Sequence, residues 1–351
     1  MNGIKEVAKA AGVSISTVSN VLNRKKYVSP ELTKKVEEAV KQLDYKVNPV
    51  ARSMKSRTTG MIGVITEDFC GLFYPYVIRG ISEVAEQKGY QLVICDAHGT
   101  RGDSHAVERE KELFRKLFNN RVDGVIFVST VSARYTNTYF ESIKRMANQY
   151  KKTPLVSLER NFASAGIDSV YFDGYANAKM AVSHLIDCGC RKIGHISGPK
   201  TLFVAKERIK GYEDCLKENN MGGFDGTVEG DYTHSSGYKG MEELLERLPD
   251  IDGVFCANDQ TAIGAIMKLQ EAGKRIPADV KVIGYDDVFV SGVINPPIST
   301  VHIQKRHAGT RAAEVLFKRI EETVNSGEEY PPEEIKMEGR LVVRRSTVAD
   351  F

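Results

Sequence analysis

The stretch VAKAAGVSISTVSNVLN, Val7 to Asn23, predicts two short helices joined at a glycine. Gly12 permits the tight turn because glycine adopts positive φ without steric cost, and small alanines stand where the helices would touch. Ser14 is the expected N-cap of the second helix. A third helix would begin at Ser29-Pro30, a cap followed by proline at the permitted first position. We therefore predict helices over residues 4–11, 15–22 and 30–43.

The charge of this N-terminal head differs from that of the remaining chain. Residues 1–58 contain twelve Lys and Arg against five Asp and Glu, a net charge of +7, whereas the whole chain carries +3 and the remainder therefore −4. A small basic module on a mildly acidic body indicates that the head alone meets a polyanion. The structural alternative is a helical hairpin with a solvated, lysine-rich surface.

The second helix of a helix-turn-helix lies in the major groove of DNA, with its N-terminal residues at the base edges. In this pattern Ile15, Ser16 and Asn20 would face the groove. The hydroxyl side chains of Thr17 and Ser19 suit contacts with phosphate. The head therefore predicts a DNA-binding module.

From Met61 onward, short apolar runs alternate with amphipathic helical patterns. This alternation predicts an α/β fold with parallel sheets covered by helices on both faces, and the number of units favours two sub-domains. The predicted strands lie at 61–66, 90–95, 123–129, 154–159, 169–173, 192–197, 253–259 and 280–287. The predicted helices lie at 76–88, 103–119, 177–188, 261–272 and 306–324, before a strand-like tail, EIKMEGRLVVRRS.

Signatures of catalysis and of bound metals are scarce. The chain has no G-x-G-x-x-G after its first strand, no P-loop and no H-E-x-x-H, and its six cysteines form no C-x-x-C pair. Asp173, Asp259 and Asp286 stand at strand ends, where open α/β sheets bind ligands. We therefore predict ligand binding without catalytic residues, cofactor or metal. The lack of a membrane-length apolar run and of a signal-peptide pattern predicts a cytoplasmic protein.

Several motifs resemble those of one regulator family. EVAKAAGVSISTVSNVLN resembles the DVAxxAGVSxxTVSRVLN motif of the lactose-repressor (LacI/GalR) family, and YKVNPVARSMKS resembles its hinge helix. HISGP, RIKGYEDCL, CANDQTAIGA, VIGYDDV and NPPISTVHIQ resemble its body motifs in the expected order. The resemblance covers essentially the whole chain and implies a helix-turn-helix head, a hinge helix and two doubly wound sub-domains like those of type I periplasmic binding proteins. The implied domains are 1–46 (head), 47–59 (hinge) and 60–351 (effector binding and dimerisation), the last divided into 60–161 plus 292–322 and 162–291 plus 323–351.

The resemblance also implies residue roles on DNA. It assigns base reading to Ile15, Ser16 and Asn20, and Asn20 stands where arginine is common, which favours adenine over guanine. Met54 stands where the family usually has an intercalating leucine, and its apolar side chain can serve as the same wedge. Three further positions match contacts with the DNA backbone: Asn23, Tyr27 and Asn48.

In the body, the resemblance implies an effector cleft. Carboxylates that accept hydrogen bonds from sugar hydroxyls, a forked arginine donor and aromatic rings over the apolar face together suit a carbohydrate. Glu159 replaces a commoner aspartate and reaches deeper. The implied effector-binding residues are Phe73, Tyr74, Glu159, Arg208, Tyr232, Asn258 and Asp286.

Together these observations predict a transcriptional repressor that binds a palindromic operator in double-stranded DNA as a homodimer, with a sugar or sugar phosphate controlling operator affinity. One alternative is a regulator with a phosphorylated carrier protein as co-repressor, on which residues near Gln304-Lys305 would bear. Another is a cytoplasmic sugar-binding protein without DNA function, which the basic head disfavours. The scarcity of catalytic motifs disfavours an enzyme on the same scaffold.

Overall fold

The computed structural model describes residues 3–23, 26–45, 58–97, 103–132, 136–150, 152–223, 225–325 and 330–349. The chain divides into two compact units, residues 1–59 and 60–351. Asn48 and Met54 of the predicted hinge lie outside the described residues, as does the side chain of Asn23. Among the described residues, no helix is long and apolar enough to cross a membrane.

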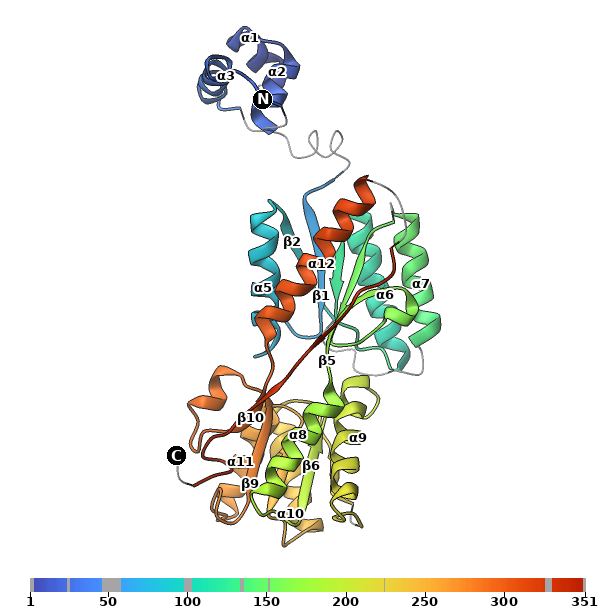
Figure 1. The fold of residues 1–351 in the computed structure, drawn as a ribbon, viewed down its shortest axis with the longest axis vertical. Helices are drawn as coiled ribbons and strands as arrows, with labels where there is room; N and C mark the ends of the chain where they lie inside the picture. Colours follow the sequence, from blue (N-terminus) through green and yellow to red (C-terminus); the bar gives the residue numbers. More distant parts are fainter. Residues whose placement is uncertain are drawn as a thin grey trace. The chain divides into compact units, whose positions relative to one another are not determined.

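The first unit contains the three helices α1 (Ile4–Ala11), α2 (Ile15–Asn23) and α3 (Pro30–Gln42) (Figure 1). The predicted helices are confirmed to within one residue at each end. Both predicted caps are present: Ser14 Oγ accepts the Thr17 N–H at 3.1 Å, and Ser29 Oγ accepts the Leu32 N–H at 3.5 Å. Gly12 ends α1 with φ +63°, the left-handed conformation that this turn requires. The buried core is formed by Val7, Ala8, Val18, Val36 and Ala39.

The second unit begins with a six-stranded parallel sheet, which we call lobe 1 together with its helices. Its strand order is β11-β5-β4-β3-β1-β2. Helices α5 (Tyr74–Gln87) and α12 (Lys305–Asn325) pack on one face, and α6 (Asp103–Asn119) and α7 (Thr136–Gln149) on the other. The strands are β1 (Met61–Thr66), β2 (Gln91–Asp96), β3 (Val125–Phe127), β4 (Leu155–Leu158), β5 (Asp168–Phe172) and β11 (Glu334–Met337).

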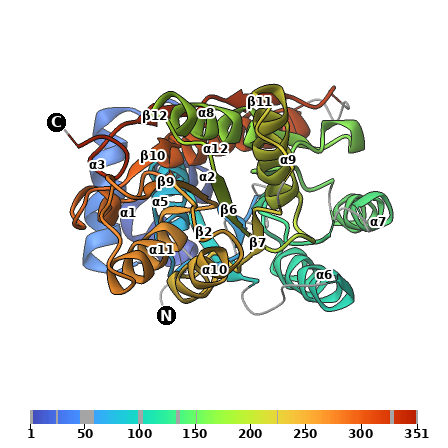
Figure 2. The same cartoon turned by 90° about the horizontal axis from the view of Figure 1, so that it is seen from below.

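Lobe 2 is a second six-stranded sheet of order β12-β10-β9-β8-β6-β7, parallel except for β12. Helices α8 (Gly174–Asp187) and α9 (Phe203–Glu218) cover one face, and α10 (His234–Arg247) and α11 (Asp259–Glu271) the other (Figure 2). The strands are β6 (Ile193–Ser197), β7 (Thr227–Glu229), β8 (Gly253–Cys256), β9 (Lys281–Asp286), β10 (Ser299–His302) and β12 (Arg340–Val342).

The α/β fold with two doubly wound sheets is confirmed, but the predicted division of the body is wrong for three strands. Strands β5 and β11 belong to lobe 1, whereas β10 belongs to lobe 2. The chain therefore passes between the lobes after β5, after β10 and between β11 and β12. An apolar run in the sequence predicts a strand but not the strands beside it. The pairing of Val156 with Asp168 places β5 beside β4, and the pairing of Ser299 with Ile283 places β10 beside β9.

In both lobes the first strand lies between the second and the third, so each sheet has a topological switch point. These points fall between β1 and β3 in lobe 1 and between β6 and β8 in lobe 2. In such sheets, ligands bind in the crevice at the carboxyl ends of the strands. The loops that follow the strands on either side of these points, β1 and β3 in lobe 1 and β6 and β8 in lobe 2, are therefore the places to look for a site.

Candidate functional site

The first candidate site is the exposed side of α2 in the head. Val18 is fully buried among Val7 and Val36, which fixes the helix on the core. Ile15 is 39% exposed although it is apolar, and Ser16 is exposed beside it. The predicted contact residues Thr17, Ser19 and Asn20 are partly exposed on the same helix. The geometry thus leaves the predicted DNA-contact side chains accessible.

The N-terminus of α2 carries a cluster of hydroxyl groups. Ser14 Oγ lies 2.7 Å from Ser16 Oγ and 2.8 Å from Thr17 Oγ1. The positive end of a helix dipole with nearby hydroxyl donors suits the phosphates of a DNA backbone. Tyr27 is 89% exposed and therefore accessible, and its predicted contact with the DNA backbone stays a prediction.

The second candidate site is a cleft between lobes 1 and 2, with a cavity of about 160 Å³. Pockets for drug-sized molecules span about 300–1,000 Å³, so this cavity suits a smaller ligand. All seven predicted effector residues line it, and their role in binding stays a prediction. Lobe 1 contributes Phe73, Tyr74 and Glu159, and lobe 2 contributes Arg208, Tyr232, Asn258 and Asp286.

Three of these residues have strained backbones. Glu159, Tyr232 and Asp286 have φ angles of +69°, +68° and +102°, a region that side chains other than glycine rarely occupy. Glu159 directly follows β4, and Asp286 ends β9. Such strain persists where the surrounding structure enforces it, and it concentrates at ligand sites.

Arg208 on α9 is the only basic side chain among the described residues that line this cavity. Its Nη1 donates to the Ala257 carbonyl at 2.6 Å, and its guanidinium carbon lies 3.8 Å from the centre of the Tyr285 ring. Its Nε is buried and has no hydrogen-bond partner among the described residues, and neither has the hydroxyl of Tyr232. Buried polar groups are almost always partnered, so these two atoms are exceptions among the described residues.

Burial raises the pKa of two carboxyl groups of the cleft, those of Glu159 and Asp286, toward neutral pH. Burial raises the pKa of Glu159 to about 7, and the charges of Glu67 and Asp286 contribute to the increase. Burial also raises the pKa of Asp286 to about 6. The Tyr74 hydroxyl donates to Glu159 Oε2 at 3.2 Å, which orients that carboxyl group. The cleft therefore offers both hydrogen-bond acceptors and a protonatable group to ligand hydroxyls.

Asn258 has a structural task as well as a place in the cleft. Its Oδ1 caps α11 by accepting from the Thr261 N–H at 2.8 Å and from Thr261 Oγ1 at 2.7 Å. Its Nδ2 donates to the Tyr232 carbonyl at 3.0 Å. Gly198 allows this arrangement, because a Cβ atom there would lie 2.1 Å from the Tyr232 ring. Asn258 thus positions Tyr232.

The structure adds lining residues that sequence reasoning missed. Glu67 and Asp68 follow β1 directly, and their position after a strand was the available signal. Asp259 also lines the cavity, but its carboxyl group accepts from the Val288 N–H at 2.8 Å and from Thr300 Oγ1 at 2.7 Å. Asp173, the other strand-end aspartate, caps α8 and is outside the cleft. The remaining lining residues are Gly71, Leu72, Val204, Thr233, Gln260 and Val288.

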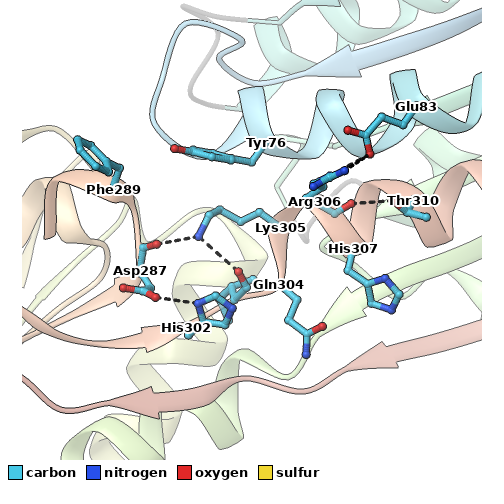
Figure 3. A pocket seen from close by; sticks show the side chains of 11 residues that line it. Tyr76, Glu83, Asp287, Phe289, His302, Gln304, Lys305, Arg306, His307 and Thr310 are labelled. Atoms are coloured by element: carbon cyan, nitrogen blue, oxygen red, sulfur yellow. Dashed lines mark hydrogen bonds and ion pairs between the residues drawn. The ribbon is translucent and has the colours of Figure 1, made fainter. Parts of the chain in front are cut away.

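A second cavity of about 600 Å³ lies where the chain passes from β10 to α12. Figure 3 shows Lys305 pointing toward Asp287, whose carbonyl accepts from Nζ at 3.1 Å; the carbonyls of Asp286 and Ile303 accept from it as well. Arg306 forms an ion pair with Glu83 of α5 at 2.7 Å. Both cations near this crossover are therefore already engaged.

Comparisons with known proteins agree with this geometry. Residues 3–48 match the model of bacterial regulatory proteins, lacI family, and residues 182–347 match that of the periplasmic binding protein-like domain. The chain is 33% identical to the ribose operon repressor of Halalkalibacterium halodurans over 99% of this chain and 97% of that protein. It is 35% identical to the HTH-type transcriptional repressor PurR of Pasteurella multocida over 99% and 98%.

Solved structures resemble the chain over its whole length. The lac repressor dimer bound to operator and the anti-inducer ONPF has a TM-score of 0.86 and 27% identity, with 99% of both chains covered. The complex of the transcriptional regulator CelR with cellobiose has a TM-score of 0.70 and 29% identity, covering 99% of this chain and 100% of that one.

Proposed function

This chain belongs to the lacI family of bacterial regulatory proteins, and on that premise we propose that a carbohydrate in its cleft controls how tightly its head binds a palindromic operator. The chain is a DNA-binding transcriptional regulator and not an enzyme. The observation that carries the effector proposal is the cleft itself, in which the unpartnered Arg208 Nε and Tyr232 hydroxyl lie near the carboxyl groups of Glu159 and Asp286.

The chemistry of the cleft favours a monosaccharide-sized polyol. Glu159 and Asp286 can accept hydrogen bonds from neighbouring hydroxyls, and Arg208 and Tyr232 can donate. Phe73 and Tyr74 meet edge to face at 5.2 Å and can cover the apolar face of a sugar ring. The small cavity supports a single sugar unit over a larger ligand.

Effector binding and operator binding would be linked through the arrangement of the two lobes. Residues of both lobes would contact the effector, so its binding would shift the equilibrium between arrangements of the lobes. That shift would change how two heads are presented to one operator, and the linkage is reciprocal. The expected location of such a regulator is the cytoplasm.

A homodimer is supported by apolar side chains left exposed on the body. Phe289 and Val293 are 72% and 65% exposed, and Ile94 is exposed on the edge strand β2. Apolar side chains that gather in one exposed patch mark an interaction site, and Phe289 and Val293 lie close together in the segment after β9. A second copy of the chain suits this surface because a palindromic site calls for two heads related by two-fold symmetry.

The alternative of a phosphorylated carrier protein as co-repressor finds less support. Lys305 directs its ammonium group at three backbone carbonyls, and Arg306 is paired with Glu83 (Figure 3). A phosphoryl group would have to compete with these partners. The carbohydrate proposal is therefore preferred.

The test is thermal unfolding of the full-length protein with D-ribose, D-glucose, D-galactose, glucose 6-phosphate, cellobiose and hypoxanthine. A sugar that binds the folded state raises the unfolding temperature by mass action. Arg208→Met should abolish the increase, whereas Arg145→Met, an exposed arginine on α7, should retain it. An increase with hypoxanthine alone would refute the carbohydrate proposal and leave DNA binding untouched.

A further inference from the structure

Arg160 is a buried cation next to the cleft that no predicted role accounts for. It directly follows Glu159, and only 4% of it is exposed. Its Nη1 donates to the Val131 carbonyl at 2.8 Å, which fixes the guanidinium group at the carboxyl end of the lobe 1 sheet. A buried arginine is costly unless its charge is compensated, so its surroundings need an explanation.

Two aromatic rings from different lobes flank this guanidinium group. Its central carbon lies 4.6 Å from the centre of the Phe162 ring and 5.0 Å from that of Phe203. Phe162 is buried in the core of lobe 1. Phe203 is the first residue of α9 in lobe 2 and lines a small extension of the cleft, about 30 Å³ in volume. The contact between Arg160 and Phe203 therefore crosses from one lobe to the other.

Arg160 is held from behind by a buried network in lobe 1. Glu110 of α6 is fully buried and accepts from Ser129 Oγ at 2.9 Å, from the Thr130 N–H at 2.6 Å and from the Tyr139 hydroxyl at 2.6 Å. These bonds fix the segment after β3 whose Val131 carbonyl accepts from Arg160. The cation is thus presented to lobe 2 by a rigid support.

Phe203, whose ring contacts Arg160, lies on α9, the helix that also carries Arg208. Val204 and Arg208 follow Phe203 on α9, and both line the cleft. A separation of the lobes at this edge would remove Phe203 from Arg160 and Arg208 from Glu159 in one movement. The contact between Arg160 and Phe203 is therefore present when lobe 1 and lobe 2 face each other across the cleft.

We propose that Arg160 is a positioning residue for effector binding: its cation–π contact with Phe203 holds α9, and with it Arg208, against lobe 1. This inference rests on the proposed function of the cleft. A cation–π contact contributes about 0.5–2 kcal/mol, which corresponds to an affinity change of about 2- to 30-fold. If the binding-competent arrangement becomes less populated, apparent affinity falls by the same factor.

The chain contains no tryptophan, so a single one at position 203 would be a specific reporter. Phe203→Trp keeps an aromatic face for the cation, and Trp is the best such partner. We would measure emission and acrylamide quenching of full-length Phe203→Trp without added sugar, alone and combined with Arg160→Met, Arg160→Lys or Arg145→Met. Circular dichroism would establish that each variant is folded.

The contact predicts at least a two-fold increase in the quenching constant and a red shift of emission for Arg160→Met. Lysine should give a smaller change, since it retains the charge, and Arg145→Met none. Unchanged quenching in folded Arg160→Met would overturn the proposal. This measurement needs no effector, so its outcome is independent of whether the cleft binds a sugar.

A second pair of variants covers the case in which Arg160→Met does not fold. Phe203→Leu removes the ring on lobe 2, and Phe118→Leu, the control, removes a buried ring of the lobe 1 core that stacks on Tyr150. Titration with the sugars of the thermal panel should show a 2- to 30-fold weaker affinity for Phe203→Leu only. Phe118→Leu should lower the unfolding temperature and leave affinity unchanged. Equal affinities for Phe203→Leu and wild type would overturn the inference.

Discussion

The hydroxyl of Tyr232 allows a prediction in which stability and binding change in opposite directions. In the absence of ligand this hydroxyl is buried and has no hydrogen-bond partner among the described residues. An unpaired buried polar group costs about 1–3 kcal/mol. Tyr232→Phe removes that cost and keeps the ring, so the free energy of unfolding should rise by about 1–3 kcal/mol. At an unfolding entropy of about 2.1 cal/mol/K per residue, each kcal/mol raises the unfolding temperature of a chain of this length by about 1–2 °C.

The same substitution should weaken effector binding, because the hydroxyl can no longer donate to the ligand. A hydrogen bond contributes about 0.5–1.5 kcal/mol net, which corresponds to an affinity about 2- to 13-fold weaker. The assay is thermal unfolding of full-length wild type and Tyr232→Phe, without sugar and across a titration with the sugar that binds. Stability should increase without sugar, and the increase caused by sugar should shrink.

Tyr285 provides the matched control. It is also buried at the cleft, but its hydroxyl accepts from Asn177 Nδ2 at 2.9 Å. Tyr285→Phe leaves that amide donor without its partner, so the unfolding temperature should fall. If Tyr232→Phe lowered stability as Tyr285→Phe does, the Tyr232 hydroxyl would be satisfied in the free protein and the reasoning would be refuted.

Three further predictions concern pH, base preference and assembly. Glu159 has a folded-state pKa of about 7, above its ordinary 4.5, so the folded state retains this proton and the free energy of unfolding falls as pH rises from about 4.5 to 7. In thermal unfolding between pH 5 and 8, Glu159→Gln should make that decrease smaller. An unchanged dependence on pH would contradict the raised pKa of Glu159. Asn20→Arg should shift the preferred base from adenine to guanine by about 1–3 kcal/mol in binding to selected operators; an unchanged preference would mean that Asn20 does not read a base. Phe289→Asp should reduce the mass measured by light scattering from dimer to monomer, with Arg145→Asp on α7 as an exposed control, and a persistent dimer would exclude this surface.

Much of the fold could be predicted because local signals determine it. Ser14 and Ser29 each stand directly before the helix that they cap, so a short stretch of sequence is enough to place both helix starts. The helices of the head therefore begin and end within one residue of the predicted positions. The alternation of strands and helices in the body is likewise predicted by apolar patterns within short stretches of sequence. Which strands share a sheet depends on pairing between segments that are distant in the sequence, as for β5 and β11. A short stretch of sequence does not predict such pairing.

The candidate site shows the same division. Residue types and the family resemblance predicted seven cleft residues that the structure brings to one cavity. They could not predict that the Asn258 side chain caps α11 and donates a hydrogen bond to the Tyr232 carbonyl. They also could not predict that Arg160 meets Phe203, because that contact exists only once two separate sheets face each other.

The most direct test of the account is operator affinity measured as a function of effector concentration. Full-length protein would be used to select a palindromic DNA from a random library, and its binding to that DNA would be followed by fluorescence anisotropy. The titrant would be the sugar that raises the unfolding temperature. The account predicts that saturating sugar changes operator affinity by about 5- to 150-fold, the usual range for coupled sites, and that operator changes sugar affinity by the same factor. The same operator affinity at every sugar concentration, with sugar bound, would contradict it.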